Sequence, residues 1–356
     1  MSKRTDEQVH SALGLGLLVF AAGACLMCVE IIGAMAIAPY FGSTVYVWGS
    51  VLAVFMGALS LGYVLGGRVA DVRPDVRVLS LLAVGAGLLV MLVPLAGAPV
   101  CGTLLRVDAG AVLNRLRPLV ALLLLFFLPS MLLGMITPVA VRIASTALAT
   151  VGRVVGRLYA LNTLGSVVGA LVSTFVLVLL FGNRAILVGC GAVLGLVGLV
   201  CLYLQRSLAV AGPPVSRRGT RRAPADSAGR VPGLRPLVFA CGMVLMSLEV
   251  IGGAEIAPYF GSSVFVWGSV ITVFLGALAV GYRLGGRLAD RWPTMRALAT
   301  VVVAAGIGIL LVPILVPPLC KALLGASPGL EINVLRPLVA SVVLYVVPIG
   351  LLAMVA

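Results

Sequence analysis

Two glutamates inside long apolar stretches are the residues of this sequence best placed to do chemistry. Glu30 and Glu249 each lie within a run of apolar residues long enough to cross a bilayer as a helix. A charged side chain at the centre of a membrane helix costs roughly 2.5–3.5 kcal/mol on insertion scales, unless it is paired, hydrated or neutralised. The pair therefore predicts a site for a cation or a proton, with protonation coupled to substrate movement. Glu255 is a third acidic candidate.

A structural role for these glutamates is the alternative. Each carboxyl group would then be neutral, or would cap backbone groups that are freed by the following proline, Pro39 or Pro258. Both interpretations remain open at the level of the sequence.

The segments around the two glutamates are copies of one another. Residues 30–71 and 249–290 are identical at 29 of 42 positions with a constant offset of 219. Shared hydrophobicity alone does not produce such identity. The repeat predicts two structurally equivalent halves.

Composition identifies the class of protein. Hydrophobic residues make up 62% of the chain, charged residues make up 10%, and the mean hydropathy is +1.21. These values predict an all-α polytopic membrane protein. Apolar spans of the length that crosses a bilayer occur near residues 13–38, 44–66, 78–101, 118–141, 158–181, 185–204, 236–257, 263–285, 297–320 and 337–356.

The ten spans divide into six and four. Residues 1–204 form a first six-helix repeat, and residues 236–356 form the first four helices of a second. Between them, residues 205–235 are rich in Pro, Gly, Ser and Arg, which predicts a flexible basic linker. Counterparts of Pro138 to Leu204 are missing from the second repeat, so we expect a truncated or interrupted chain; a genuine ten-helix protein is the alternative.

Basic residues predict the orientation. If the N-terminus is cytoplasmic, 19 of the 25 Lys and Arg residues, including those of the 205–235 linker, fall on the cytoplasmic side. We therefore expect a multi-pass protein of the inner (plasma) membrane, with the lipid bilayer as its surroundings and no nucleic acid as partner. His10 is the only histidine, and the seven cysteines show no metal-ligand spacing, so no metal site or cofactor is predicted.

The order of the repeats resembles that of the major facilitator transporters. Six helices separate equivalent positions, so both copies enter the membrane in the same direction. Parallel repeats of this kind relate the two halves of a major facilitator.

A narrower resemblance is carried by EIIGAMAIAPYFGSTVYVWGSVLAVFMGALSLGYVLGGRVAD, GMITPVAVRIA and GRLYALNTLGSVVGALVSTFVL. These strings resemble the membrane domain of fused transporter–spermidine synthase proteins. The resemblance implies a link to polyamines. The chain shows no strand followed by a Gly-rich nucleotide loop, so we do not expect an enzyme.

Two functions follow from this resemblance. One is a transporter of a small cationic solute such as a polyamine. The other is a non-transporting membrane anchor or partner module for a separately encoded soluble aminopropyltransferase, or a fragment of such a fusion.

A Gly-Gly-Arg motif closed by Asp recurs in both halves. It is expected on the cytoplasmic loop after the second helix of each half, where it resembles the gating loop of major facilitators; the alternative is a plain orientation signal. Its residues are Gly66, Gly67, Arg68, Asp71, Gly285, Gly286, Arg287 and Asp290.

The fifth span carries a polar face and a small-residue stripe. Tyr159 and Asn162 are candidates for contact with substrate, and Gly165, Gly169 and Ser173 recur at spacing four, which is typical of close helix packing. A polar pore lining is the alternative for this helix. Trp48 and Trp267 are expected to anchor the outer membrane interface.

Overall fold

A computed structural model describes residues 2–106, 110–144, 151–208, 234–292, 294–325 and 330–355, and within these residues all regular secondary structure is helical. The first half contains α1 (Ser2–Phe41), α2 (Val45–Val72), α3 (Val76–Arg106), α4 (Gly110–Ala144), α5 (Val151–Val172), the π-helical turn η2 (Ser173–Leu177), α6 (Val178–Leu180) and α7 (Asn183–Leu208). The second half contains α8 (Leu234–Phe260), α9 (Val264–Arg291), α10 (Met295–Gly325) and α11 (Leu330–Ala353).

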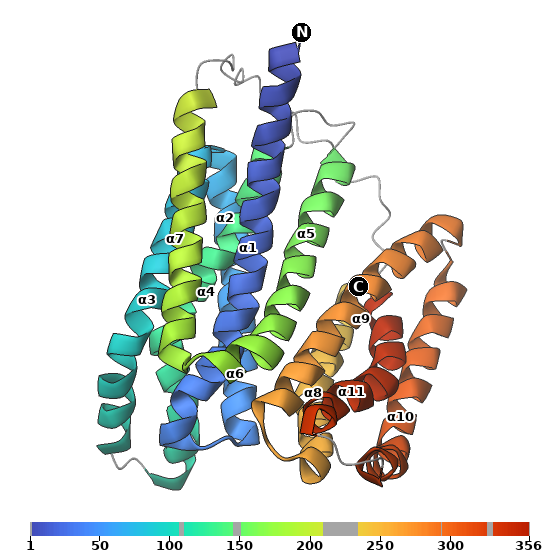
Figure 1. Ribbon diagram of the computed structural model, residues 1–356. Coiled ribbons are helices and arrows are strands. Elements are labelled where there is room, and N and C mark those ends of the chain that lie inside the picture. Colours follow the sequence, from blue (N-terminus) through green and yellow to red (C-terminus); the bar gives the residue numbers. More distant parts are fainter. Residues whose placement is uncertain are drawn as a thin grey trace.

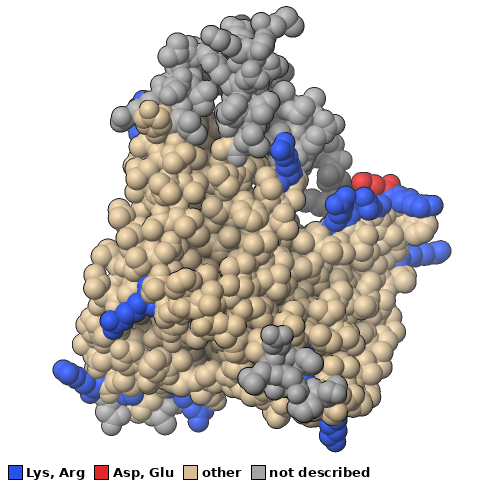
Figure 2. All heavy atoms as spheres, in the orientation of Figure 1, with Lys and Arg blue, Asp and Glu red and all other residues tan. Residues whose placement is uncertain are grey.

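Ten helices in the described part of the chain are long and apolar enough to cross a membrane. This confirms the predicted all-helical, polytopic architecture and the number of spans. On the face shown in Figure 2, Lys and Arg side chains gather toward the upper and lower ends, and the broad surface between them is almost free of charge. Such an uncharged band is what a bilayer requires of the surface that it contacts.

The helices form two bundles. In Figure 1, α1 to α7 stand at the left and α8 to α11 stand at the right. The bundles meet at their lower ends and spread apart toward the end at which the N-terminus lies. Each bundle has its own core of buried hydrophobic residues, and Trp267 and Ile271 of α9 belong to the core of the first.

Equivalent residues of the repeat make equivalent contacts. The rings of Phe55 and Phe126 lie 5.8 Å apart between α2 and α4, and those of Phe274 and Tyr345 lie 5.5 Å apart between α9 and α11. All of these residues are buried. The repeated sequence therefore folds into repeated local packing.

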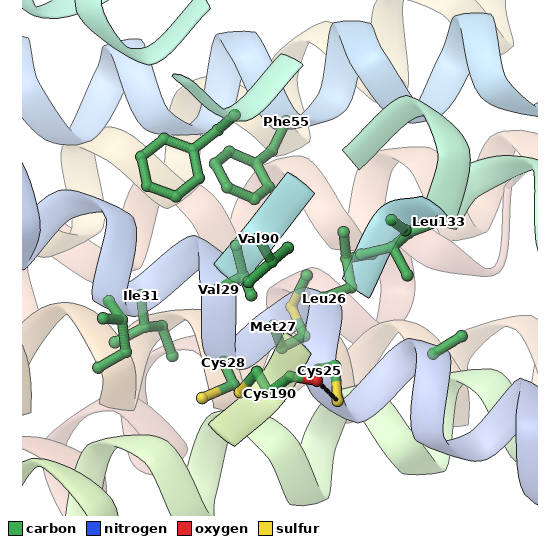
Figure 3. Packing of buried hydrophobic residues seen from close by; sticks show 14 of the residues in the cluster. Cys25, Leu26, Met27, Cys28, Val29, Ile31, Phe55, Val90, Leu133 and Cys190 are labelled. Atoms are coloured by element: carbon green, nitrogen blue, oxygen red, sulfur yellow. Dashed lines mark hydrogen bonds between the residues drawn. The ribbon is translucent and has the colours of Figure 1, made fainter. Parts of the chain in front are cut away.

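The small-residue stripe of α5 packs against α1. A side chain at Gly165 would collide with the carbonyl oxygen of Phe20, and one at Gly169 would collide with that of Ala24. The two helices thus approach backbone to backbone and run in the same direction, which confirms the packing interpretation of this stripe. Figure 3 shows the neighbouring core, in which the thiol of Cys25 donates a hydrogen bond to the carbonyl oxygen of Cys190 at 3.8 Å.

Two expectations about loops need correction. The Gly-Gly-Arg motifs do not lie on loops, because α2 continues to Val72 and α9 to Arg291. The helices tolerate the glycines because Gly66 packs against the backbone of Met135 and Gly285 against that of Met354. Residues 205–208 and 234–235 are helical rather than part of the linker, and the rest of that linker lies outside the described residues.

Candidate functional site

Glu30 is buried in the middle of α1. Its side chain is 1% exposed, and neither carboxylate oxygen has a hydrogen-bond partner within the described part of the chain. It therefore does not cap backbone groups near Pro39, which removes the capping alternative for Glu30. A buried carboxylate without a partner is costly.

Glu249 occupies the equivalent position on α8 and is 5% exposed. The two buried glutamates thus come from equivalent positions of the two halves. Glu255 follows Glu249 by six residues on α8 and is half-buried next to Tyr345 of α11. The hydroxyl of Tyr345 donates a hydrogen bond to the carbonyl oxygen of Gly252 at 3.2 Å.

Two threonines that the sequence reasoning did not single out lie at the boundary between the halves. Thr174, in the π-helical turn η2, is fully buried and packs so tightly against α9 that a side chain at Gly268 would collide with it. Thr272 lies one turn further along α9 and is 6% exposed. Neither hydroxyl has a partner within the described residues.

The register of the helices brings Thr174 and Glu30 to the same height. Gly169 of α5 lies against Ala24 of α1. Thr174 follows Gly169 by five residues, a rise of about 8 Å along the helix axis. Glu30 follows Ala24 by six residues, a rise of about 9 Å along a parallel axis. Glu30 and Thr174 therefore lie within one helical turn of each other along the helix axes, and Thr174 contacts α9 of the other half. π-Helical turns of this kind often mark functional sites.

The two tryptophans close the boundary at one end. The rings of Trp48 and Trp267 stack with centroids 5.0 Å apart and an angle of 11° between their planes. The side chains are 2% and 1% exposed. The prediction that they anchor the outer membrane interface is wrong, because each indole is covered by the other half of the protein.

A pair of serines lies beyond the tryptophans. The hydroxyl of Ser43 donates to the carbonyl oxygen of Ser262, and the hydroxyl of Ser262 donates to that of Ser43, each at 2.9 Å. The indole N–H groups of Trp48 and Trp267 donate to the hydroxyls of Ser43 and Ser262 respectively, each at 3.4 Å. All four residues obey the offset of 219, so the contact has pseudo-two-fold symmetry.

The polar face of α5 divides between two surroundings. Asn162 stands against Gly23 of α1, and the hydroxyl of Ser166 donates to the carbonyl oxygen of Gly23 at 3.4 Å. Both therefore face the interior of the first half. Tyr159 is 41% exposed. Asn162 thus contributes to packing within one half rather than to the boundary.

Of the motif residues at the ends of α2 and α9, Asp71 forms an ion pair with Arg142. The Nε atom of Arg142 in α4 lies 3.7 Å from Oδ1 of Asp71, with both side chains largely exposed. Arg68 and Arg287 are exposed at the surface. The motif thus ties α2 to α4 inside one half.

A comparison with protein-family models decides the family. The model described as Major Facilitator Superfamily matches residues 13–355, which is nearly the whole chain. The chain belongs to the Major Facilitator Superfamily. Membership in a superfamily of transporters also supports the prediction that the chain is not an enzyme.

Solved structures agree with this assignment at the level of the fold. A crystal structure of a bacterial homolog of the human lysosomal transporter Spinster, in an inward-facing and unoccupied conformation, superimposes with a TM-score of 0.58 at 17% identity. The match covers 97% of this chain and 74% of the Spinster homolog. No curated protein matches the sequence.

The site of this major facilitator was predictable only in part. The glutamates were found because charge inside an apolar span is conspicuous. Thr174 and Thr272 were missed because threonine is common in membrane helices, and the sequence gives no sign that their hydroxyls lack partners. The offset of 219 was the available signal for the serine and tryptophan contact, since it pairs Ser43 with Ser262 and Trp48 with Trp267.

Proposed function

We propose that this chain is a secondary transporter that moves a small cationic solute, such as a polyamine, with proton coupling, through a site formed by Glu30 and Glu249. One observation carries the proposal: equivalent positions of the two halves each bury a carboxyl group, and that of Glu30 has no protein partner among the described residues. Two like charges in a membrane interior require a counter-charge, which a bound cation or a proton supplies.

The hydroxyls of Thr174 and Thr272 complete the proposed site. Both are buried, both lack partners in the described part of the chain, and both lie at the boundary between the halves. Oxygen atoms of carboxylates and hydroxyls are suitable acceptors for an ammonium group, whose N–H groups are all donors. The donors of a cationic solute would therefore find acceptors on α1, α8, α9 and η2.

The polyamine itself comes from the narrower resemblance. The repeated segment at 30–71 resembles the membrane domain of transporter–spermidine synthase fusions, and an acidic site suits a polycation. Glu255 is proposed as a further acidic contact, because it follows Glu249 by six residues on α8 and is only half-buried. Tyr159 is proposed to contact the solute nearer the open end.

We further propose an orientation. The excess of Lys and Arg assigns the N-terminus and the 205–235 linker to the cytoplasmic side of the inner membrane. The two halves touch at the opposite end, through Ser43, Trp48, Ser262 and Trp267. The site would then be closed to the outside, which is the inward-facing arrangement named for the Spinster homolog.

Uptake of labelled spermidine into proteoliposomes tests the proposal. Purified wild-type chain is compared with Glu30→Gln and Glu249→Gln, with and without an imposed proton gradient. We expect gradient-dependent uptake in the wild type and at least a tenfold loss in each variant, because Gln keeps the shape but removes the charge.

The matched control is Ser247→Ala, two positions from Glu249 on an exposed part of α8, where the hydroxyl bonds only to Met243 of its own helix. It should transport as the wild type does. An uptake rate equal to that of the wild type in both glutamine variants would overturn the proposed site. No uptake by folded wild-type protein would overturn the transporter.

A second candidate function rests on one observation. In the most apolar stretch of α10 only 22% of residues are buried, and in that of α8 only 28%. Such open faces suit a module that assembles with other membrane segments. The proposed role of such a module is to anchor a soluble aminopropyltransferase to the membrane. Co-purification of an aminopropyltransferase with the tagged chain, without uptake of spermidine, would favour this function.

A further inference from the structure

We propose that Ser43, Trp48, Ser262 and Trp267 form a gate, a symmetric latch that closes the solute pathway at the end opposite the N-terminus and must open for the cycle to proceed. The proposal rests on the proposed transport function. It goes further by naming the residues that separate the acidic site from one side of the membrane.

The position of the tryptophan stack makes it a barrier. Atoms Cε3 and Cη2 of Trp267 lie 2.5 and 2.8 Å from the place where a β-carbon on Gly253 would sit, so the indole rests directly on the backbone of α8. Gly253 is one turn, about 6 Å, beyond Glu249. The stacked rings therefore lie immediately beyond the acidic pair, on the side of the serine turns.

The latch has two layers of different character. The tryptophan layer is dry, with both side chains at least 98% buried. The serine layer lies in exposed turns, where water can replace the hydrogen bonds. The apolar tryptophan layer blocks ions and polar solutes. The serine hydrogen bonds can break without leaving buried polar groups unsatisfied, because water takes the place of the lost partners.

The turns that carry the serines are built alike. Each follows a glycine with positive φ, 79° at Gly42 and 83° at Gly261, which ends the preceding helix with a backbone bond to the fourth residue before it. Glycine adopts this left-handed conformation without strain. The backbone geometry thus presents Ser43 and Ser262 to each other in the same way from both sides.

Symmetry explains why the latch can be both specific and reversible. Each serine donates across the boundary and accepts from the tryptophan of its own half. Separation of the halves breaks the crossing bonds and the stack together, while each Trp–Ser contact stays inside its half. The latch therefore behaves as a single two-state element rather than as four independent contacts.

A disulfide in place of the serine layer tests the latch. In the double variant Ser43→Cys/Ser262→Cys, mild oxidation should join the halves in most molecules, and spermidine uptake should fall at least tenfold and return on reduction. The matched control is Ser50→Cys/Ser269→Cys, a pair with the same offset whose hydroxyls bond back to Tyr46 and Phe265 of their own helices. This control pair should not cross-link.

A second readout does not depend on transport. In a Trp292→Phe background, which removes the exposed tryptophan, the remaining fluorescence comes from Trp48 and Trp267. Reduced Ser43→Cys/Ser262→Cys protein should show a fraction of fluorescence that acrylamide quenches, and oxidation should lower that fraction at least twofold.

The outcomes separate the two proposals. Uptake that persists in the cross-linked protein overturns the gate and leaves the transporter standing. Absence of uptake in the wild type overturns the transporter, and the fluorescence measurement then tests the latch. Acrylamide quenching that falls on oxidation supports a latch that opens. Unchanged quenching, or a cysteine pair that fails to cross-link, overturns the latch.

Discussion

The first and second halves carry the same repeated segment but place it in different surroundings. In the most apolar stretch of α1, 78% of the residues are buried, but in the equivalent stretch of α8 only 28% are. Gly23 of α1 lies against the backbone of Asn162, whereas its counterpart Gly242 has no atom within 4 Å of the place of a β-carbon. Helices α5 and α7 cover the first half, and no described helix covers the same faces of the second.

This difference shows which properties of a helix depend on its own sequence and which depend on the neighbouring helices. Residues 249–290 form helices with the same bounds, relative to the offset, as residues 30–71. The internal contacts between α9 and α11 also repeat those between α2 and α4. Helix formation and packing inside a half are thus properties of the repeat, whereas burial depends on which further helices are present.

The largest effect should come from a glycine that is covered in one half and open in the other. A side chain at Gly87 of α3 would meet the carbonyl oxygen of Gly191 at 2.6 Å and the backbone nitrogen of Gly195 at 3.0 Å. Backbone atoms cannot move aside as a flexible side chain can. We expect Gly87→Val to lower the stability by at least about 1–3 kcal/mol, the usual cost of overpacking, or to prevent folding, as measured by thermal unfolding in detergent.

The matched variant is Gly306→Val on α10, at the same offset. Gly306 has nothing within 4 Å, so the change should stay within about 0.5 kcal/mol of the wild type. An equal loss of stability in both variants would mean that the face of α10 is covered after all, and the comparison between the halves would fail.

A smaller effect is expected where the halves differ by one hydroxyl. Tyr345 and Phe126 are equivalent, and the Tyr345 hydroxyl donates to Gly252 at 3.2 Å while Phe126 packs on Gly33 without such a bond. Tyr345→Phe should cost about 0.5–1.5 kcal/mol, the net value of one buried hydrogen bond.

Thermal unfolding also measures this change. The control is Tyr282→Phe on α9, where the side chain is 53% exposed and the change should be close to neutral. A neutral Tyr345→Phe would show that the hydroxyl adds nothing to the packing that Phe126 achieves without it.

The sequence predicted the architecture well because its signals are local. Apolar runs near 20 residues are sufficient to locate membrane helices, and the offset of 219 was sufficient to relate the halves. Burial of Glu30 and Glu249 followed from the same logic, since a charge inside an apolar span has no exit to water. The family match over residues 13–355 agrees with this interpretation.

What the sequence could not predict is which surfaces meet. Trp48 follows a turn at the end of a span, as an interfacial tryptophan does, and only the structure reveals that Trp267 covers it. The Gly-Gly-Arg motif was placed on a loop because its position and composition resemble the gating loop of major facilitators, but close contact of Gly66 with Met135 stabilises the helical form. In each case a contact across at least 60 residues of sequence decided the outcome.

The smallest effect concerns the charges at the ends of α2 and α9. Asp71 pairs with Arg142 at 3.7 Å, whereas Asp290, its counterpart, has no ion pair among the described residues. Because both partners of the first pair are largely exposed, water and salt screen it, and Asp71→Asn should cost less than about 1 kcal/mol. Asp290→Asn should be neutral.

Salt dependence distinguishes this weak pair from a structural role of Asp71. The loss in Asp71→Asn should shrink as salt rises from 0.01 M to 1 M, because the screening length falls from roughly 30 Å to roughly 3 Å. A cycle with Arg142→Gln isolates the pairwise energy. If Asp71→Asn destabilises the protein equally with and without Arg142, the aspartate acts through the end of its helix and not through the ion pair. Asp71→Asn and Asp290→Asn would then be expected to have the same effect.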